Sequence, residues 1–240
     1  MPKILRVRRG MKDREKEKLR LSRMSTYERE LWGEGLSLIA GVDEAGRGPL
    51  AGPVVAAAVI LGKDTFLCGL DDSKKLSPRK RAEIFPEIWR EAAAVGVGVV
   101  SEVIIDRINI LQATYLAMRR AVADLSALPA QAGLKVSPDC LLVDGMTIPK
   151  LDIGQLAIVN GDSLSLSIAA ASVVAKVTRD RIMVEQDKHF PQYGFAGHKG
   201  YGTKEHLRAL DKYGVCSLHR RSFKPVQERL NNKIGKEGTK

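Results

Sequence analysis

Hydrophobic residues in this chain fall mainly into short continuous runs, separated by polar turns and by segments of helical spacing. Leu38–Val42, Val54–Leu61 and Val95–Val100 are almost wholly apolar, which is typical of strands buried on both faces. Cys140–Val143 is expected to be a fourth strand, and Gln155–Val159 a short fifth strand. The five runs predict a five-stranded sheet, with the first two strands antiparallel because only a short turn joins them.

Segments of helical spacing separate these runs. A helix is expected over Ser77–Ala94, begun by a serine cap and kinked or split at Pro86. Further helices are expected over residues 106–125 and about 165–188, and the second of these starts with small residues that allow close packing on a sheet. This alternation of strands and helices predicts an α/β fold.

The flanking segments differ from this core in composition. The expected divisions are a basic extension (1–33), mobile or helical and outside the core, an α/β catalytic domain (34–188), a C-terminal loop and helical region (189–232) and a disordered tail (233–240).

Charge is distributed unevenly along the 240 residues. The net charge is +11, with +6 in residues 1–30, +8 in residues 176–240 and −3 in residues 31–175. Basic ends around an acidic middle favour a polyanion such as nucleic acid, held around a metal-binding centre. Basic tails that only aid solubility would give the same pattern.

Other features of the composition bear on the cellular location of the protein and on the kinds of site it can hold. No charge-free apolar run of about 18 residues is present, so no membrane-spanning helix is expected. The charged N-terminus does not resemble a secretory signal. Cys68, Cys140 and Cys216 form no CxxC pair, which argues against a zinc site or a disulfide framework. A cytoplasmic protein, acting as a monomer, is expected.

Acidic residues stand where predicted strands end. Asp43 and Glu44 follow the first strand, Asp144 follows the fourth, and Asp162 precedes the long helix. If the first and fourth strands are parallel neighbours, Asp43 and Asp144 meet at the carboxyl edge of the sheet. Magnesium prefers carboxylate oxygens, and two ions about 4 Å apart can promote in-line hydrolysis of a phosphodiester.

Each of these carboxylates also has a simpler interpretation. Asp43 and Glu44 could form a solvated turn, Asp144 a plain Asp-Gly turn, and Asp162 a helix cap. Neighbouring strand residues point to opposite faces, so Glu44 shares a metal site with Asp43 only past the strand end, or through its carbonyl or a water. All four together on a basic chain favour the metal site.

Several motifs, taken in chain order, resemble those of bacterial ribonuclease HII, a type 2 ribonuclease H. The resemblance covers about residues 38–230. The motifs are Gly41-Val42-Asp43-Glu44-Ala45-Gly46-Arg47-Gly48-Pro49, Asp72-Ser73-Lys74-Lys75-Leu76-Ser77, Val143-Asp144-Gly145, Gly161-Asp162-Ser163, Lys199-Gly200-Tyr201-Gly202-Thr203 and His219-Arg220-Arg221-Ser222-Phe223.

The resemblance implies a ribonuclease H-like mixed five-stranded sheet flanked by helices, with a small C-terminal helical appendage. It implies hydrolysis of the RNA strand of RNA/DNA hybrids and cutting 5′ of ribonucleotides embedded in duplex DNA, with 5′-phosphate and 3′-hydroxyl ends. A role in ribonucleotide removal during DNA replication and repair follows. Carried over by motif, the catalytic and metal-binding residues, for two Mg²⁺ or Mn²⁺ ions, are Asp43, Glu44, Asp144 and Asp162.

The resemblance also implies contacts to nucleic acid. It gives Gly46-Arg47-Gly48 as the turn that recognises the ribose 2′-OH, Tyr201 as the ring that stacks on the following deoxyribose, and Ser73 and Lys74 as phosphate contacts. Tyr193 is the alternative stacking residue, although a loop anchor is the favoured interpretation of it.

Basic residues on the long helix are a separate expectation, drawn from the sequence itself. Lys176, Arg179 and Arg181 are interpreted as phosphate contacts or, equally, as a solvated face. Two other functions also remain open. Another nuclease or recombinase of this fold would lack the Gly46–Gly48 turn and Tyr201 in register, and a non-catalytic RNA-binding protein would tolerate loss of a carboxylate.

Overall fold

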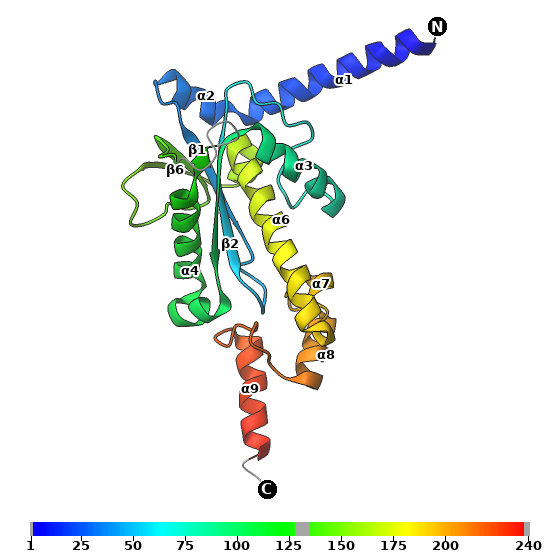
Figure 1. Ribbon diagram of the computed structural model, residues 1–240, viewed down its shortest axis with the longest axis vertical. Helices are drawn as coiled ribbons and strands as arrows, with labels where there is room; N and C mark the ends of the chain where they lie inside the picture. Colours follow the sequence, from blue (N-terminus) through cyan, green and yellow to red (C-terminus); the bar gives the residue numbers. More distant parts are fainter. Residues whose placement is uncertain (1, 128–134, 238–240) are drawn as a thin grey trace.

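Six strands form one mixed sheet in the computed structural model, which describes residues 2–127 and 135–237 (Figure 1). The strands are β1 (Ile39–Ala45), β2 (Val54–Leu61), β3 (Ala92–Val100), β4 (Ser126–Ala127), β5 (Cys140–Asp144) and β6 (Gly154–Ile158). Their order is β4-β3-β2-β1-β5-β6. β1 is antiparallel to β2 and parallel to β5. The five predicted strands are confirmed, and the two-residue β4 adds a short edge.

Helices cover both faces of this sheet (Figure 1). They are α1 (Pro2–Met24), α2 (Thr26–Gly33), α3 (Pro78–Glu91), α4 (Glu102–Asp124), α5 (Gly161–Leu164), α6 (Leu166–His189), the 3₁₀ turn η1 (Pro191–Tyr193), α7 (Phe195–His198), α8 (Lys204–Tyr213) and α9 (Lys224–Glu237). Alternate residues of β2 serve the two faces: Ala56 and Ala58 pack toward α4, and Ala57 and Val59 toward α6 and α3. This period of two explains why the whole strand is apolar.

Close packing of α6 on β1 brings the two elements together beside the carboxylates. A Cβ atom on Gly41 would lie 2.1 Å from the carbonyl carbon of Ser167 and 2.2 Å from the nitrogen of Ile168. Only glycine permits this approach of backbone to backbone. The close packing predicted for the start of α6 is therefore observed, and glycine on β1 is what permits it at this contact.

Helix boundaries differ from the expected ones in two places. The Ser77 side chain caps α3 by accepting a hydrogen bond from the nitrogen of Lys80, as predicted. The helix runs through Pro86 without being split and ends at Glu91, because β3 already begins at the next residue. α4 starts earlier than expected and contains a break at Asn109, whose φ is 64°.

The N-terminal extension is helical, but the expectation that it lies outside the core is wrong for its second half. Leu21 and Met24 are buried in the core cluster under α3 and α6. Leu31 and Trp32 pack against residues of β1 and β5. The carboxylate of Glu28, 1 % exposed, accepts hydrogen bonds at the start of α6. Residues 21–32 are therefore part of the folded domain.

The C-terminal region is mostly as expected. The predicted loop from residue 190 contains the short η1 and α7, and two helices follow it. α9 continues to Glu237, so part of the segment expected to be disordered is helical, and residues 238–240 lie outside the described residues.

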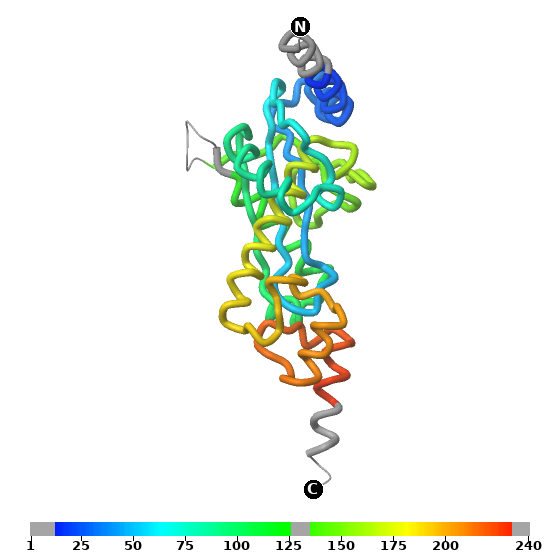
Figure 2. The backbone as a smooth tube through the Cα atoms, turned by 90° about the vertical axis from the view of Figure 1, so that its right-hand side faces the viewer, coloured from blue at the N-terminus to red at the C-terminus, as the bar shows by residue number. Residues whose placement is uncertain are grey.

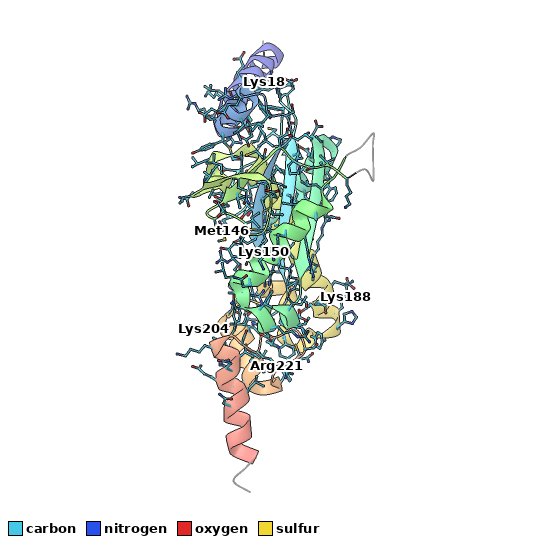
Figure 3. The ribbon with its side chains drawn as sticks, turned by 90° about the vertical axis from the view of Figure 1, so that its left-hand side faces the viewer. Lys18, Met146, Lys150, Lys188, Lys204 and Arg221 are labelled. Atoms are coloured by element: carbon cyan, nitrogen blue, oxygen red, sulfur yellow. The ribbon has the colours of Figure 1, made fainter. Side chains whose placement is uncertain are left out.

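The N-terminal and C-terminal helices lie at opposite ends of the molecule, with the sheet between them (Figures 1 and 2). Figure 3 shows Lys18 near one end and Lys204 and Arg221 near the other, in keeping with the uneven distribution of charge. Within the described ranges, no helix has both the length and the apolar character needed to cross a bilayer.

Candidate active site

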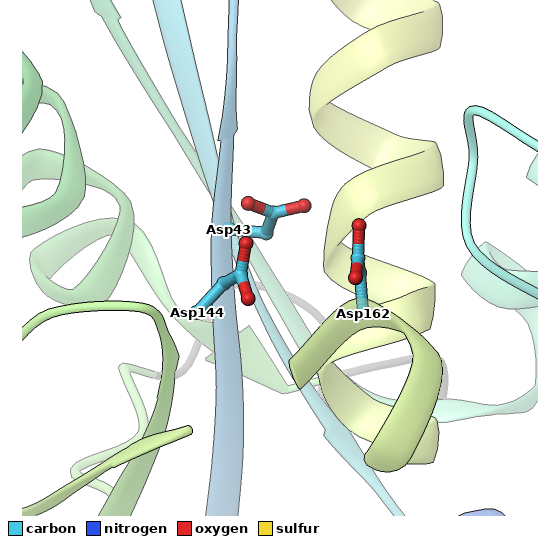
Figure 4. Close-up of side chains that lie close together, drawn as sticks. All are labelled: Asp43, Asp144 and Asp162. Atoms are coloured by element: carbon cyan, nitrogen blue, oxygen red, sulfur yellow. The ribbon is translucent and has the colours of Figure 1, made fainter. Parts of the chain in front are cut away.

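Three of the four predicted carboxylates come together at one edge of the sheet (Figure 4). Asp43 lies near the end of β1, Asp144 ends β5, and Asp162 lies in the one-turn α5. One carboxylate oxygen from each lies within 4.8 Å of the others. Such a group of oxygens is suited to hard divalent cations.

Strand pairing accounts for this convergence. In the parallel pair of β1 and β5, Val42 lies opposite Val143, so the next residues, Asp43 and Asp144, leave the sheet at the same level. The nitrogen of Gly161 donates a hydrogen bond of 2.7 Å to an oxygen of Asp144, which ties α5 to the end of β5. Asp162 is thereby held beside the two strand residues, as predicted.

Burial makes this cluster electrostatically costly on its own. Asp43 is 5 % exposed, and burial, together with the charges of Glu44 and Asp144, raises the pKa of Asp43 well above its usual value. Burial also raises the pKa of Asp144, although the hydrogen bond from Gly161 partly offsets this effect. A bound divalent cation would favour the charged forms, so the donor set and its environment fit a metal site.

Glu44, the fourth predicted carboxylate, pairs with a cation of the neighbouring turn. Its side chain forms an ion pair with Arg47 at 3.3 Å. Burial raises the pKa of Glu44, and the positive charge of Arg47 acts in the opposite direction. Glu44 borders the same pocket as Asp43 but is not one of the three clustered carboxylates, in keeping with the expectation that adjacent strand residues diverge.

Lys74 is bonded to a carboxylate in this structure. Its Nζ atom lies 2.8 Å from an oxygen of Asp162, and this hydrogen bond is the main reason why the pKa of Lys74 is raised. The lysine side chain is still 75 % exposed. The Ser73 backbone is fixed by the Ser172 hydroxyl and by Arg81, so the pair Ser73–Lys74 borders the pocket from a rigid loop.

A pocket of about 230 Å³ opens beside Asp43. Two carboxylates line it, those of Asp43 and Glu44, together with the turn at residues 46–48, Lys176 and Tyr201. The lining residues are Asp43, Glu44, Ala45, Gly46, Arg47, Gly48, Ser73, Lys74, Arg81, Lys176 and Tyr201. Most of the residues predicted to contact nucleic acid therefore share one concave surface.

The two glycines of the turn have different roles. Gly46 has a φ of +94°, and a Cβ atom there would lie 2.0 Å from Nε of Arg179. Gly48 does not have a positive φ, and its added Cβ would meet only the ring of Tyr201 at 3.8 Å. Of the two positions, therefore, only Gly46 has a backbone conformation that favours glycine.

The degree of burial distinguishes Tyr193 from Tyr201. Tyr193 is 4 % exposed, and its hydroxyl donates a hydrogen bond to the carbonyl of Gly214, so it is the loop anchor that was favoured. Tyr201 is 44 % exposed and borders the pocket. The Tyr201 ring is thus the one available to a ligand.

Arg179 does not have the exposed position expected of a phosphate contact. It is 1 % exposed, and its guanidinium donates to the carbonyls of Ala51, Pro53 and Lys199. Arg179 is therefore part of the internal framework. Lys176, on the same helix, lines the pocket and forms an ion pair with Asp180.

Sequence reasoning missed two residues near the site. Arg81 borders the pocket and holds the Ser73 carbonyl, and its place in the basic first turn of α3 was an available signal. Arg220 lies inside a recognised motif but had no assigned role, and it is fully buried behind the turn at residues 46–48.

A family model for ribonuclease HII matches residues 40–226. The chain belongs to the ribonuclease HII family. The ribonuclease HII of Geobacillus thermodenitrificans is 56 % identical over 225 residues, which cover 92 % of this chain and 83 % of that protein. The ribonuclease HII of Clostridioides difficile is 53 % identical over 208 residues, covering 87 % and 78 %.

Solved structures show the same fold. Ribonuclease H2 from Pyrococcus horikoshii gives a TM-score of 0.65 at 24 % identity, covering 81 % of this chain and 98 % of that one. Archaeoglobus fulgidus ribonuclease HII, solved in complex with PCNA, gives 0.63 at 26 % identity, covering 78 % and 95 %. The ribonuclease H-like fold is confirmed, and by its family the chain is a metal-dependent endoribonuclease that acts on RNA/DNA hybrids.

Proposed function

We propose that this member of the ribonuclease HII family cuts 5′ of single ribonucleotides embedded in duplex DNA as well as the RNA strand of hybrids, leaving 5′-phosphate and 3′-hydroxyl ends. The observation that carries the proposal is the pocket that Asp43, one of the three clustered carboxylates, shares with the Gly46–Gly48 turn and Tyr201. The protein would act as a monomer in the cytoplasm, and its role would be to remove ribonucleotides during DNA replication and repair.

The carboxylates Asp43, Asp144 and Asp162, with Glu44 nearby, are the residues that would hold two Mg²⁺ or Mn²⁺ ions. When bound, such ions supply an activated water and stabilise the leaving oxygen of the sugar. The protein fixes the carboxylates through strand pairing and through the hydrogen bond from Gly161 to Asp144. Lys74 lies where it can contact a substrate phosphate once its bond to Asp162 is released.

Sugar recognition would come from the turn at residues 46–48 and from Tyr201, which line the same pocket. The 2′-OH both donates and accepts hydrogen bonds, so a polar backbone turn can distinguish ribose from deoxyribose. Tyr201 presents a half-exposed ring, which would pack on the next sugar where a 2′-OH would clash. Lys176, whose Nζ lies 6.0 Å from the centre of that ring, would bind the adjoining phosphate.

The proposal is tested by incubating the purified protein with duplex DNA that holds one ribonucleotide, with and without magnesium. We expect one cut, 5′ of the ribonucleotide, that requires the metal. An all-DNA duplex of the same sequence is the control and should remain intact. Cleavage of a full RNA/DNA hybrid without cleavage of the single-ribonucleotide duplex would refute the finer specificity and leave the family activity in place.

A further inference from the structure

Arg220 places a buried guanidinium directly behind the turn at residues 46–48. Its side chain is 0 % exposed. It donates to the carbonyls of Gly46 at 2.6 Å and Arg47 at 2.9 Å, and to those of Gly52 and Pro53 at 2.9 and 3.1 Å. All of these acceptors are backbone atoms of one hairpin. Arg220 therefore fixes the conformation of a backbone segment instead of pairing with a carboxylate.

Peptide geometry gives this contact a consequence on the opposite side of the turn. In a trans peptide the C=O and N–H bonds point in opposite directions. The Gly46 and Arg47 carbonyls both point inward to Arg220, so the N–H groups of Arg47 and Gly48 point away from it. Within the described part of the chain, neither N–H donates to another group. Two successive free N–H groups make a concave donor site for an oxygen ligand.

We propose that Arg220 is a specificity-determining positioning residue, which holds the N–H groups of Arg47 and Gly48 in place to recognise the ribose 2′-OH. This inference rests on the proposed function, because it assumes that the turn reads the sugar. Arg220 itself has no access to substrate, since the hairpin covers it completely.

Arg179 extends the same framework to the tyrosine side of the pocket. Its guanidinium bonds the hairpin carbonyls of Ala51 and Pro53 and also the carbonyl of Lys199, two residues before Tyr201. The nitrogen of Leu50 donates to the Gly200 carbonyl at 2.8 Å. The turn and the Tyr201 loop are thus fixed relative to each other, so a change at Arg220 should disturb ribose recognition without releasing Tyr201.

The test compares binding selectivity in a non-cleaving background. Asp43→Asn and Asp43→Asn/Arg220→Lys are titrated, with magnesium, against a duplex that contains one ribonucleotide and against the all-DNA duplex of the same sequence. The readout is the selectivity ratio, which is the dissociation constant for the all-DNA duplex divided by that for the ribonucleotide duplex. Lysine keeps the charge but cannot reach four carbonyls, so we expect the ratio to fall about fivefold, the factor for one well-placed hydrogen bond.

A second background variant separates selectivity from general destabilisation. Met118→Ala removes a fully buried side chain of α4 that does not line the pocket, and should lower stability without changing the ratio. If Arg220→Lys does not fold, Phe223→Leu removes the ring that lies 5.1 Å from the guanidinium of Arg220 and should lower the ratio to a smaller extent.

The possible outcomes distinguish this inference from the function on which it rests. If the parent prefers the ribonucleotide duplex and neither Arg220→Lys nor Phe223→Leu changes the ratio, the positioning role is refuted and the proposed function stands. An equal fall with Met118→Ala would also refute the role, because destabilisation alone would then explain the result. If the parent has no preference, sugar recognition by this site is refuted, and the inference with it.

Discussion

Replacing Glu28 by alanine should destabilise the protein strongly, although this residue lies in the basic N-terminal extension. Oε1 of Glu28 accepts hydrogen bonds from the Ser165 hydroxyl at 2.6 Å and from the Ser167 nitrogen at 2.9 Å. Ser165 in turn caps α6 by accepting from the Ile168 nitrogen. The substitution would leave a buried hydroxyl and a buried N–H without their acceptor.

The expected magnitude follows from these two bonds. Each buried donor left without a partner costs roughly 1–3 kcal/mol, and Glu28→Ala leaves two of them. Glu28→Ala should therefore lower the free energy of unfolding by about 3–5 kcal/mol, a large fraction of a typical 5–15 kcal/mol. Glu28→Gln keeps one acceptor oxygen for both donors, so a loss of only about 1 kcal/mol is expected.

Urea unfolding followed by circular dichroism measures these differences, and a thermal scan should show Tm lower by roughly 10 °C for Glu28→Ala. Glu30→Ala is the matched control, since Glu30 lies on the same helix and is exposed. A Glu28→Ala protein as stable as Glu30→Ala would show that the extension does not hold the start of α6, and the structural role assigned to it would be wrong.

Four further predictions concern activity and pH. Asp144→Asn should raise the activation free energy of cleavage by several kcal/mol, and so lower kcat, because it removes a metal ligand. Near-normal turnover at limiting magnesium would contradict this. Tyr201→Ala should reduce cleavage of a single-ribonucleotide duplex more than cleavage of a full hybrid, and an unchanged ratio of rates would exclude a stacking role. Removing residues 1–12, which carry five basic and no acidic side chains, should flatten the dependence of log affinity on log salt, and an unchanged slope would show that they do not touch the duplex. His206 and His219 are buried, and burial lowers the pKa of each from 6.5 to about 4. Between these pH values the unfolded chain binds more protons than the folded one, so stability should fall as pH drops from about 6.5 toward 4, by at most about 2.7 kcal/mol per pH unit for two protons. Urea unfolding of wild type and of His206→Gln/His219→Gln at several pH values measures this dependence, and equal slopes for the two proteins would contradict the prediction.

The sequence was informative where local pattern and tertiary structure agree. β1 and β5 each contain a continuous apolar run that is followed directly by aspartate, and parallel pairing of the two runs places Asp43 and Asp144 at one edge. The N-terminal extension shows the opposite case. Its dense charge predicts a solvated segment, and only the separated apolar residues Leu21 and Met24 indicate a buried stripe, which the core cluster under α3 then accommodates.

The expectation that Arg179 on α6 contacts phosphate is wrong for a reason that the sequence does not reveal. Lys176 and Arg179 are three residues apart, so their side chains leave the helix only about 60° apart, and both were assigned to one basic face. The hairpin at residues 46–53 and the Lys199 loop cover one side of that face and leave the other open to the pocket. Nothing in the periodicity of α6 reveals this cover, because it comes from segments more than 120 residues earlier and 20 residues later in the chain. A buried guanidinium needs several fixed acceptors; the hairpin carbonyls supply them for Arg179, whereas Lys176, with a single compact ammonium, remains at the pocket edge where it can pair with Asp180 or with a phosphate.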